Sequence, residues 1–176
     1  GAVDEAIALY LRRSQEVIRS TSLAERADRS GNGALRFTDV ALLNKDGERV
    51  TFAQSGEELT VALRYVRTAP AETQAVIRLA FANMYGQRLF LCFSRASSAE
   101  PLHLQAEGQV CCIIPRLPLL PGIYRVSVWC KIGETMADNI QDAFDVEVVG
   151  GDFFGTGKLN PDDGGNFLVD HRWEVR

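Results

Sequence analysis

Residues 123–131 read IYRVSVWCK, and this stretch decides the fold. Its apolar side chains occupy every second position, at Tyr124, Val126, Val128 and Cys130, with Arg125, Ser127, Trp129 and Lys131 between them. A period of two places the two sets on opposite faces of a β-strand, one toward a core and one toward solvent. Pro121 and Gly122 stand directly before the stretch and supply a turn. A half-buried antiparallel strand is therefore predicted here.

Runs of the same kind fill the chain on both sides of this strand, from residue 35 onward. Turn residues separate them, for example at 44–47 and 84–86. The predicted strands are 35–43, 48–52, 59–66, 74–83, 88–93, 108–114, 123–131, 143–149 and 166–175. Because no helical pattern lies between them, the fold class is all-β. An antiparallel immunoglobulin-like or jelly-roll β-sandwich is predicted.

The residues before the sandwich have a different pattern. Residues 1–20 carry Val3, Ile7 and Leu11 at helical spacing, which predicts an N-terminal helix. Residues 21–33 are polar and end in the sequence SGNG, which predicts a linker. The sandwich domain is assigned to residues 34–176, and its glycine-rich stretch 150–165 to a loop or flexible arm before a closing strand.

Composition excludes several classes of function. The net charge is −4 and basic residues form no cluster, so a nucleic-acid partner is not expected. No apolar run approaches the roughly 20 residues of a membrane-spanning helix. Cysteines occur in apolar runs without the close spacing of metal ligands, so buried free thiols and no metal site are predicted. They are Cys92, Cys111, Cys112 and Cys130.

Catalytic motifs are missing from the sequence. Residues 155–158 read GTGK, which has the residue types of a phosphate-binding loop but neither its spacing nor its strand-to-helix context. Neither His103 nor His171 stands in a nucleophile–base motif. Adjacent acids such as Asp162 and Asp163 are expected to be solvated turn residues. The domain is therefore expected to be no enzyme and to need no cofactor.

An ordered set of short motifs resembles one family. The motifs are FTDV at 37–40, SGEEL at 55–59, YGQRLF at 85–90, LLPGIY at 119–124, QDAFDV at 141–146 and HRW at 171–173. Together they resemble the C-terminal carbohydrate-binding domain of Wzt-type ATPase subunits, which belong to ABC transporters that export O-antigen polysaccharides. Residues 3–11 resemble the last helix of the ATPase domain that precedes it.

This resemblance carries further expectations. It implies recognition of the exported, lipid-linked O-antigen and a homodimer that exchanges C-terminal strands. It also implies a transmembrane permease as partner and a cytoplasmic location at the inner face of the inner membrane. ATP hydrolysis would belong to a separate domain of the parent protein.

A sugar-binding surface needs an aromatic face beside hydrogen-bonding groups. Trp129 fits the first requirement, because it lies between polar positions on the solvent side of its strand. Its expected hydrogen-bonding neighbours are Arg125, Ser127, Arg78, Arg64 and Arg88. The alternative for Trp129 is a packing residue beneath a loop or an exchanged strand. For the domain as a whole, the alternative is a dimerisation or protein-interaction sandwich without a glycan site.

Overall fold

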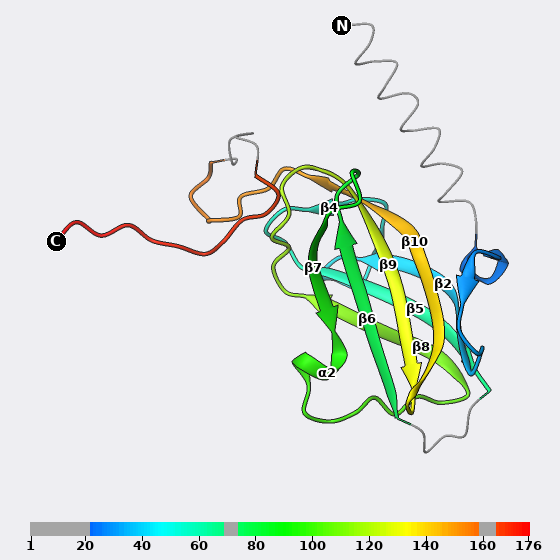
Figure 1. Ribbon diagram of the computed structural model, residues 1–176. Coiled ribbons are helices and arrows are strands. Elements are labelled where there is room, and N and C mark those ends of the chain that lie inside the picture. Colours follow the sequence, from blue (N-terminus) through cyan, green and yellow to red (C-terminus); the bar gives the residue numbers. More distant parts are fainter. Residues whose placement is uncertain (1–21, 69–73, 159–164) are drawn as a thin grey trace, which may run out of the picture.

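The computed structural model describes residues 22–68, 74–158 and 165–176. Two β-sheets pack face to face in this part of the chain, as Figure 1 shows, so the predicted all-β sandwich is confirmed. The predicted helix at 1–20 lies outside the described residues.

One sheet, named sheet A here, has six strands. Its order is β1 (Arg29–Ser30), β10 (Thr135–Val149), β9 (Gly122–Ile132), β6 (Ala75–Ala82) and β7 (Arg88–Phe93), with β4 (Ala53–Gln54) pairing with β10. Sheet B has four strands in the order β3 (Arg49–Val50), β2 (Leu35–Leu43), β5 (Leu59–Arg67) and β8 (Glu107–Ile114). Neighbouring strands are antiparallel except for β4 and β10. Two short helices, η1 (Leu23–Glu25) and α2 (Ser94–Ser97), complete the described elements.

The core lies between the sheets and follows the predicted alternation. Tyr124, Val126, Val128 and Cys130 of β9 are all buried, whereas the residues between them are partly exposed. Phe37 of sheet B and Phe81 of sheet A are completely buried. The prediction that every cysteine is buried is wrong for Cys111, which is exposed, because it points away from the core while its neighbour Cys112 points inward.

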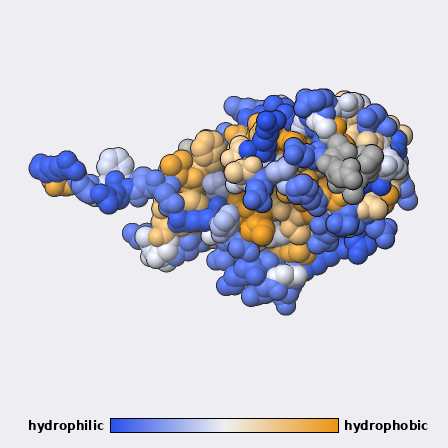
Figure 2. Space-filling view, turned by 90° about the horizontal axis from the view of Figure 1, so that it is seen from below, coloured by the Kyte–Doolittle hydropathy of each residue, from blue (hydrophilic) through white to orange (hydrophobic). Residues whose placement is uncertain are grey.

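Three predicted strands differ from the structure by more than one residue at an end. The run predicted at 48–52 is shorter in the structure, where β3 pairs with β2 of sheet B, and a separate strand that was not predicted, β4, starts at Ala53 and pairs with β10 of sheet A. The strand predicted at 143–149 begins at Thr135 instead, because residues from there onward already pair with β9. Where a closing strand was predicted at 166–175, the chain makes a single bridge, between Phe167 and Leu119. Beyond this bridge, Asp170 forms an ion pair with Arg116 and His171 packs edge-on against Phe154, and the last residues extend away from the sandwich (Figures 1 and 2).

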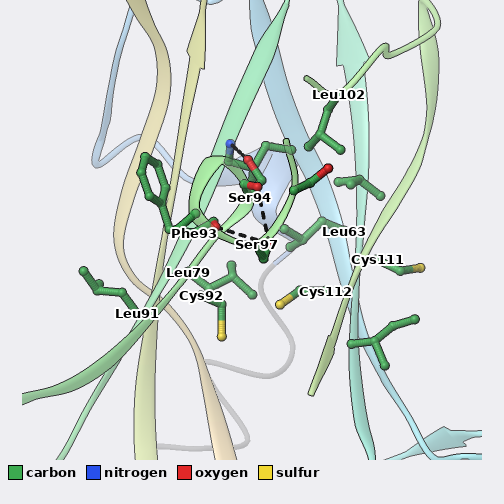
Figure 3. Close-up of a pocket in the computed structure, with 15 residues that line it drawn as sticks. Leu63, Leu79, Leu91, Cys92, Phe93, Ser94, Ser97, Leu102, Cys111 and Cys112 are labelled. Carbon is green, nitrogen blue, oxygen red and sulfur yellow. Dashed lines mark hydrogen bonds between the residues drawn. The ribbon is translucent and has the colours of Figure 1, made fainter. Parts of the chain in front are cut away.

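The sandwich is open along the side where β7 and β8 end their sheets. A cavity of about 450 Å³ lies between these two strands and α2. Figure 3 shows its lining, which is mostly apolar and includes Cys92 from β7 and Cys112 from β8.

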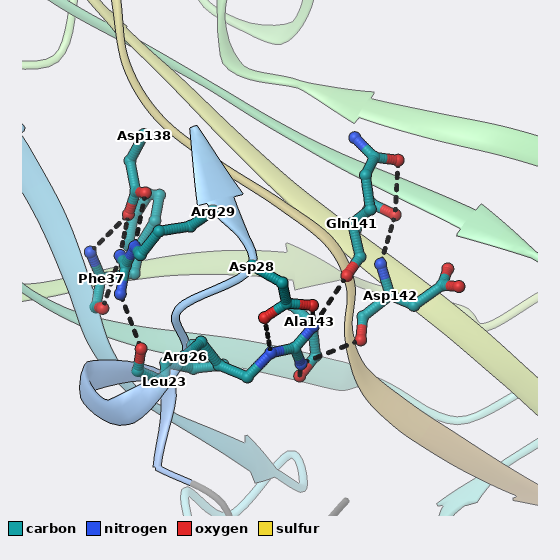
Figure 4. A network of polar contacts seen from close by, with 10 residues as sticks. Leu23, Arg26, Asp28, Arg29, Phe37, Asp138, Gln141, Asp142 and Ala143 are labelled. Atoms are coloured by element: carbon teal, nitrogen blue, oxygen red, sulfur yellow. Dashed lines mark hydrogen bonds and ion pairs between the residues drawn. The ribbon is translucent and has the colours of Figure 1, made fainter. Parts of the chain in front are cut away.

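Residues from Ser22 onward, within the stretch predicted as a linker, pack against the sandwich instead. Leu23 is only 2% exposed, and β1 pairs with β10. Arg29 forms an ion pair with Asp138 of β10, and the two side chains are 6% and 2% exposed. Arg29 also donates to the carbonyl oxygens of Leu23 and Phe37, while Asp138 accepts the Phe37 N–H (Figure 4). The Arg29–Asp138 pair therefore attaches this segment to β10 of sheet A and, through the Phe37 backbone, to β2 of sheet B.

We expect the substitution Arg29→Met to lower the free energy of unfolding by about 3–5 kcal/mol, because it leaves the Asp138 carboxylate buried without its cation. Chemical denaturation monitored by circular dichroism measures this change. Glu134→Gln is the matched control, because it breaks an ion pair with Lys131 in which the Glu134 side chain is 93% exposed, and such pairs contribute little. Equal effects of the two substitutions would contradict the assignment.

Tyr124 makes the stability of the fold depend on pH in the alkaline range. Its hydroxyl donates to the Leu120 carbonyl at 2.7 Å, and burial raises the pKa of the phenol above its ordinary value. The folded chain then keeps this proton at a pH where the unfolded chain loses it. The contribution of Tyr124 to the free energy of unfolding is therefore fully present below about pH 10, and it declines as the pH rises above that value. We expect Tyr124→Phe to reduce the slope of denaturation midpoint against pH in this range, and an unchanged slope would refute the contribution.

Candidate glycan-binding surface

The outer face of sheet A carries Trp129 at its centre. In the register of the sheet, Trp129 lies between Arg78 of β6 and Asn139 of β10, and Phe93 of β7 follows Arg78 in the same row. The Arg78 guanidinium carbon is 4.9 Å from the centroid of the indole, a cation–π contact that orients both groups. Because Trp129 is partly exposed, part of its surface remains available to a ligand.

The next row along the sheet contains two small side chains and a leucine. Ser127 lies beside Ala80, and beyond Ala80 comes Leu91 of β7. On its other side, the Ser127 hydroxyl accepts the Asp142 N–H at 3.0 Å and lies 3.5 Å from the Gln141 side-chain oxygen. Ala80 itself is buried, so the polar group of this row that a ligand can meet is the partly exposed Ser127.

A third row brings two of the predicted arginines to the same face. Ala82 of β6 lies between Arg125 of β9 and Arg88 of β7. Arg125 is also within 3.5 Å of the Asp142 carboxylate, which keeps its guanidinium near the surface formed by the first two rows. Trp129, Arg78, Ser127, Arg125 and Arg88 are thus all on the outer face of sheet A, and this set is called the platform below.

Arg64, also predicted for this site, is not brought to the platform. It lies on β5 of sheet B, between Asp39 and Gln109, and points outward from that sheet. The alternation of β5 correctly marks Arg64 as solvent-facing, but two sheets provide two solvent faces. The topology therefore corrects the predicted set: Arg64 does not lie on the same surface as Trp129.

Strand β10 adds polar groups that the sequence analysis missed. Asn139 donates to Ser30 at 3.2 Å and accepts from the Gln141 amide at 3.0 Å, which in turn lies near Ser127. These residues border the platform because β10 pairs with β9. They were overlooked because a bulge between Ile140 and Phe144 interrupts the period of two that marks a strand.

Arg26 holds this bulge in place from outside the sheet (Figure 4). Its guanidinium donates to the carbonyl oxygens of Gln141, Asp142 and Ala143 at 3.1, 3.2 and 3.3 Å. Its hydrogen bonds with Asp28 raise the Arg26 pKa and lower that of the Asp28 carboxyl. Asp142 has a φ of 46°, which is uncommon for a residue other than glycine. The clamp offsets this strained backbone and fixes the residues beside Ser127.

The platform offers an aromatic face, three guanidinium groups and a hydroxyl, which suits a ligand with apolar patches and many hydroxyl groups. Within 22–68, 74–158 and 165–176, no group of three or more His, Cys, Asp or Glu side chains is arranged to hold a metal ion. None of the helices in the described part of the chain has the length and hydrophobicity required to cross a membrane.

A comparison with known protein families matches residues 26–159 to the Wzt C-terminal domain. The chain belongs to this family. The Wzt setting is an ABC transporter, in which this domain is part of a subunit that works with a membrane permease. The platform described above therefore lies on the Wzt-type domain itself, since all of its residues fall within the matched range.

A solved structure described as the crystal structure of the C-terminal domain of wzt has the same fold. It shares 14% sequence identity with this chain, and the TM-score is 0.66. The alignment covers 89% of this chain and 100% of the other. At this identity the likeness concerns the fold alone. A search of the curated proteins found no match.

The two tryptophans differ in exposure, and fluorescence can separate them. Trp173 is 92% exposed, whereas Trp129 is partly covered by sheet A and Arg78. We expect the Trp173→Phe chain, with Trp129 alone, to emit at shorter wavelength than the Trp129→Phe chain. Reversed emission maxima in folded proteins would show that Trp129 is the more solvated indole and would contradict its placement.

Proposed function

We propose that this domain binds the O-antigen polysaccharide exported by its transporter, while the polysaccharide is still linked to its lipid carrier. Binding takes place on the platform, at the cytoplasmic face of the inner membrane, and involves no catalysis by the domain. The proposal rests on the partly exposed Trp129. Its indole lies 4.9 Å from the Arg78 guanidinium and is surrounded by hydrogen-bonding side chains. All of these residues belong to the domain that matches the Wzt C-terminal family.

The expected mode of binding follows from the chemistry of the platform. A sugar ring stacks its apolar face on the indole, and its hydroxyl groups exchange hydrogen bonds with Ser127 and the arginines. Most of these groups lie on a rather flat, wet sheet surface, where water competes for each hydrogen bond. Dissociation constants of roughly micromolar to millimolar are therefore expected for a short saccharide.

We also propose a homodimer in which the C-terminal tail of each chain pairs with its partner. The tail alternates apolar and polar residues, and its apolar members Phe167, Val169, Trp173 and Val175 are exposed. Such a segment gains most by adding to an unpaired sheet edge, where its apolar side chains become covered. The same exposed residues favour the alternative function, a dimerisation or protein-interaction sandwich without a glycan site.

Titration with the purified surface polysaccharide of the source organism tests the glycan proposal. We expect saturable binding that Trp129→Ala weakens about tenfold or more, which corresponds to about 1.4 kcal/mol of lost stacking. Isothermal calorimetry or intrinsic fluorescence measures the dissociation constant. Arg64→Ala is the matched control, because this residue lies on the outer face of the other sheet, and we expect it to leave the affinity unchanged.

Each alternative gives a different result in this titration. Binding that survives Trp129→Ala but is lost in Arg64→Ala would move the site to sheet B. A folded dimer that shows no binding to the polysaccharide would reject the glycan proposal and support the interaction sandwich. The oligomeric state is measured beside the titration by light scattering, with a chain truncated after residue 165 as the control for strand exchange.

A further inference from the structure

The cavity at the open side of the sandwich contains a pair of cysteines from two different sheets. Cys92 lies on β7, the last strand of sheet A, and Cys112 lies on β8, the last strand of sheet B. In the strand registers, Cys92 is opposite Leu79 and Cys112 is opposite Val61, both of which are core residues. Both cysteines therefore point between the sheets, and Figure 3 shows them facing the same cavity.

The two thiols lie near enough in the cavity for each to shift the pKa of the other. Neither is fully buried, and both line a cavity of about 450 Å³, so a small reagent can reach them. The other two cysteines have different surroundings. Cys111 points away from the cavity centre and contacts the Gln109 amide at 3.5 Å, and Cys130 is completely buried in the core.

The acid–base chemistry of the pair distinguishes the two sulfurs. The hydrogen bond from Cys92 stabilises the thiolate of Cys112 and lowers the pKa of Cys112, while the same bond and burial raise the pKa of Cys92. Burial, together with the charge of Asp138, raises the pKa of Cys130 to about 12. Cys112 is thus the nucleophile of the pair, and Cys92 remains a thiol that can attack it once it is oxidised.

We propose that Cys92 and Cys112 form a reversible disulfide that joins the open edges of the two sheets, with a hydroperoxide as the oxidant. In the first step the Cys112 thiolate attacks hydrogen peroxide, the O–O bond breaks, and sulfenic acid and hydroxide form. In the second step the Cys92 sulfur attacks the Cys112 sulfur, the S–O bond breaks, and the released hydroxyl leaves as water with the Cys92 proton. A dithiol reductant reverses the reaction by thiol–disulfide exchange.

The bond would have a structural effect beyond the cavity. β7 also carries Arg88 of the platform, so the disulfide would tie one border of that surface to sheet B. It would also close a loop that contains α2 and half of β8. The proposal does not depend on glycan binding, because its chemistry involves the cavity alone.

Peptide mapping of the whole chain tests this inference. The reduced protein is treated with hydrogen peroxide near neutral pH, remaining thiols are alkylated, and the digest is analysed by mass spectrometry without reduction. We expect a peptide pair linked through Cys92 and Cys112, with Cys130 alkylated only after unfolding, and loss of the link after dithiothreitol. The oxidised chain should also have a midpoint of thermal unfolding raised by roughly 5 °C.

Variants assign the roles of the two sulfurs. Cys111→Ser is the matched control, because it removes the adjacent thiol on the opposite face of β8, and the link should form as in the unsubstituted chain. In Cys92→Ser, the sulfenic acid of Cys112 should accumulate and be trapped by dimedone, whereas Cys112→Ser should leave Cys92 mostly unmodified. Mapping of the unsubstituted chain decides the proposal even if a variant fails to fold.

Two results would overturn the inference. One is a folded, peroxide-treated chain in which Cys92 and Cys112 are both still alkylated as free thiols. The other is a link that fragment-ion spectra of the peptide pair assign to Cys111 and not to Cys112, which would place the reactive sulfur on the outer face of sheet B.

Discussion

The buried ion pair between Arg29 and Asp138 is the constraint on which the arrangement of this domain depends. Its two partners lie 109 residues apart in the chain, and both are almost completely removed from solvent. Burial of two charges is costly unless their hydrogen bonds are satisfied. Here the remaining hydrogen bonds go to the backbone of Leu23 and Phe37. The pair can therefore exist only when η1, β2 and β10 are all in place.

The platform inherits its geometry from this arrangement. Asp138 fixes β10 beside β2, and Arg26 holds the bulge that follows in β10. The bulge places the Asp142 N–H against Ser127 and its carboxylate near Arg125. Polar groups on β9 are therefore positioned by residues that lie before the sandwich in the sequence. The platform lies on the face of one sheet, but its geometry depends on Arg26 and Arg29, which are about a hundred residues earlier in the chain.

Local periodicity accounts for what could be predicted from the sequence. The alternation at 123–131 predicted both the buried face of β9 and the solvent side of Trp129, because one strand on a sandwich has one face of each kind. It did not assign Arg64 to sheet B, because the pattern of a strand contains no information on which sheet it joins. The start of β10 at Thr135 was missed since the bulge between Ile140 and Phe144 adds two residues to β10 and interrupts the alternation there.

The docked segment from Ser22 to Ser30 has a mechanical consequence. If this segment were flexible, the sandwich could change its orientation relative to it. This segment is instead fixed by Arg26 to one sheet and by Arg29 to both. Residues 22–30 and the sandwich therefore turn together as one body, so the orientation of sheet A follows the orientation of this short segment.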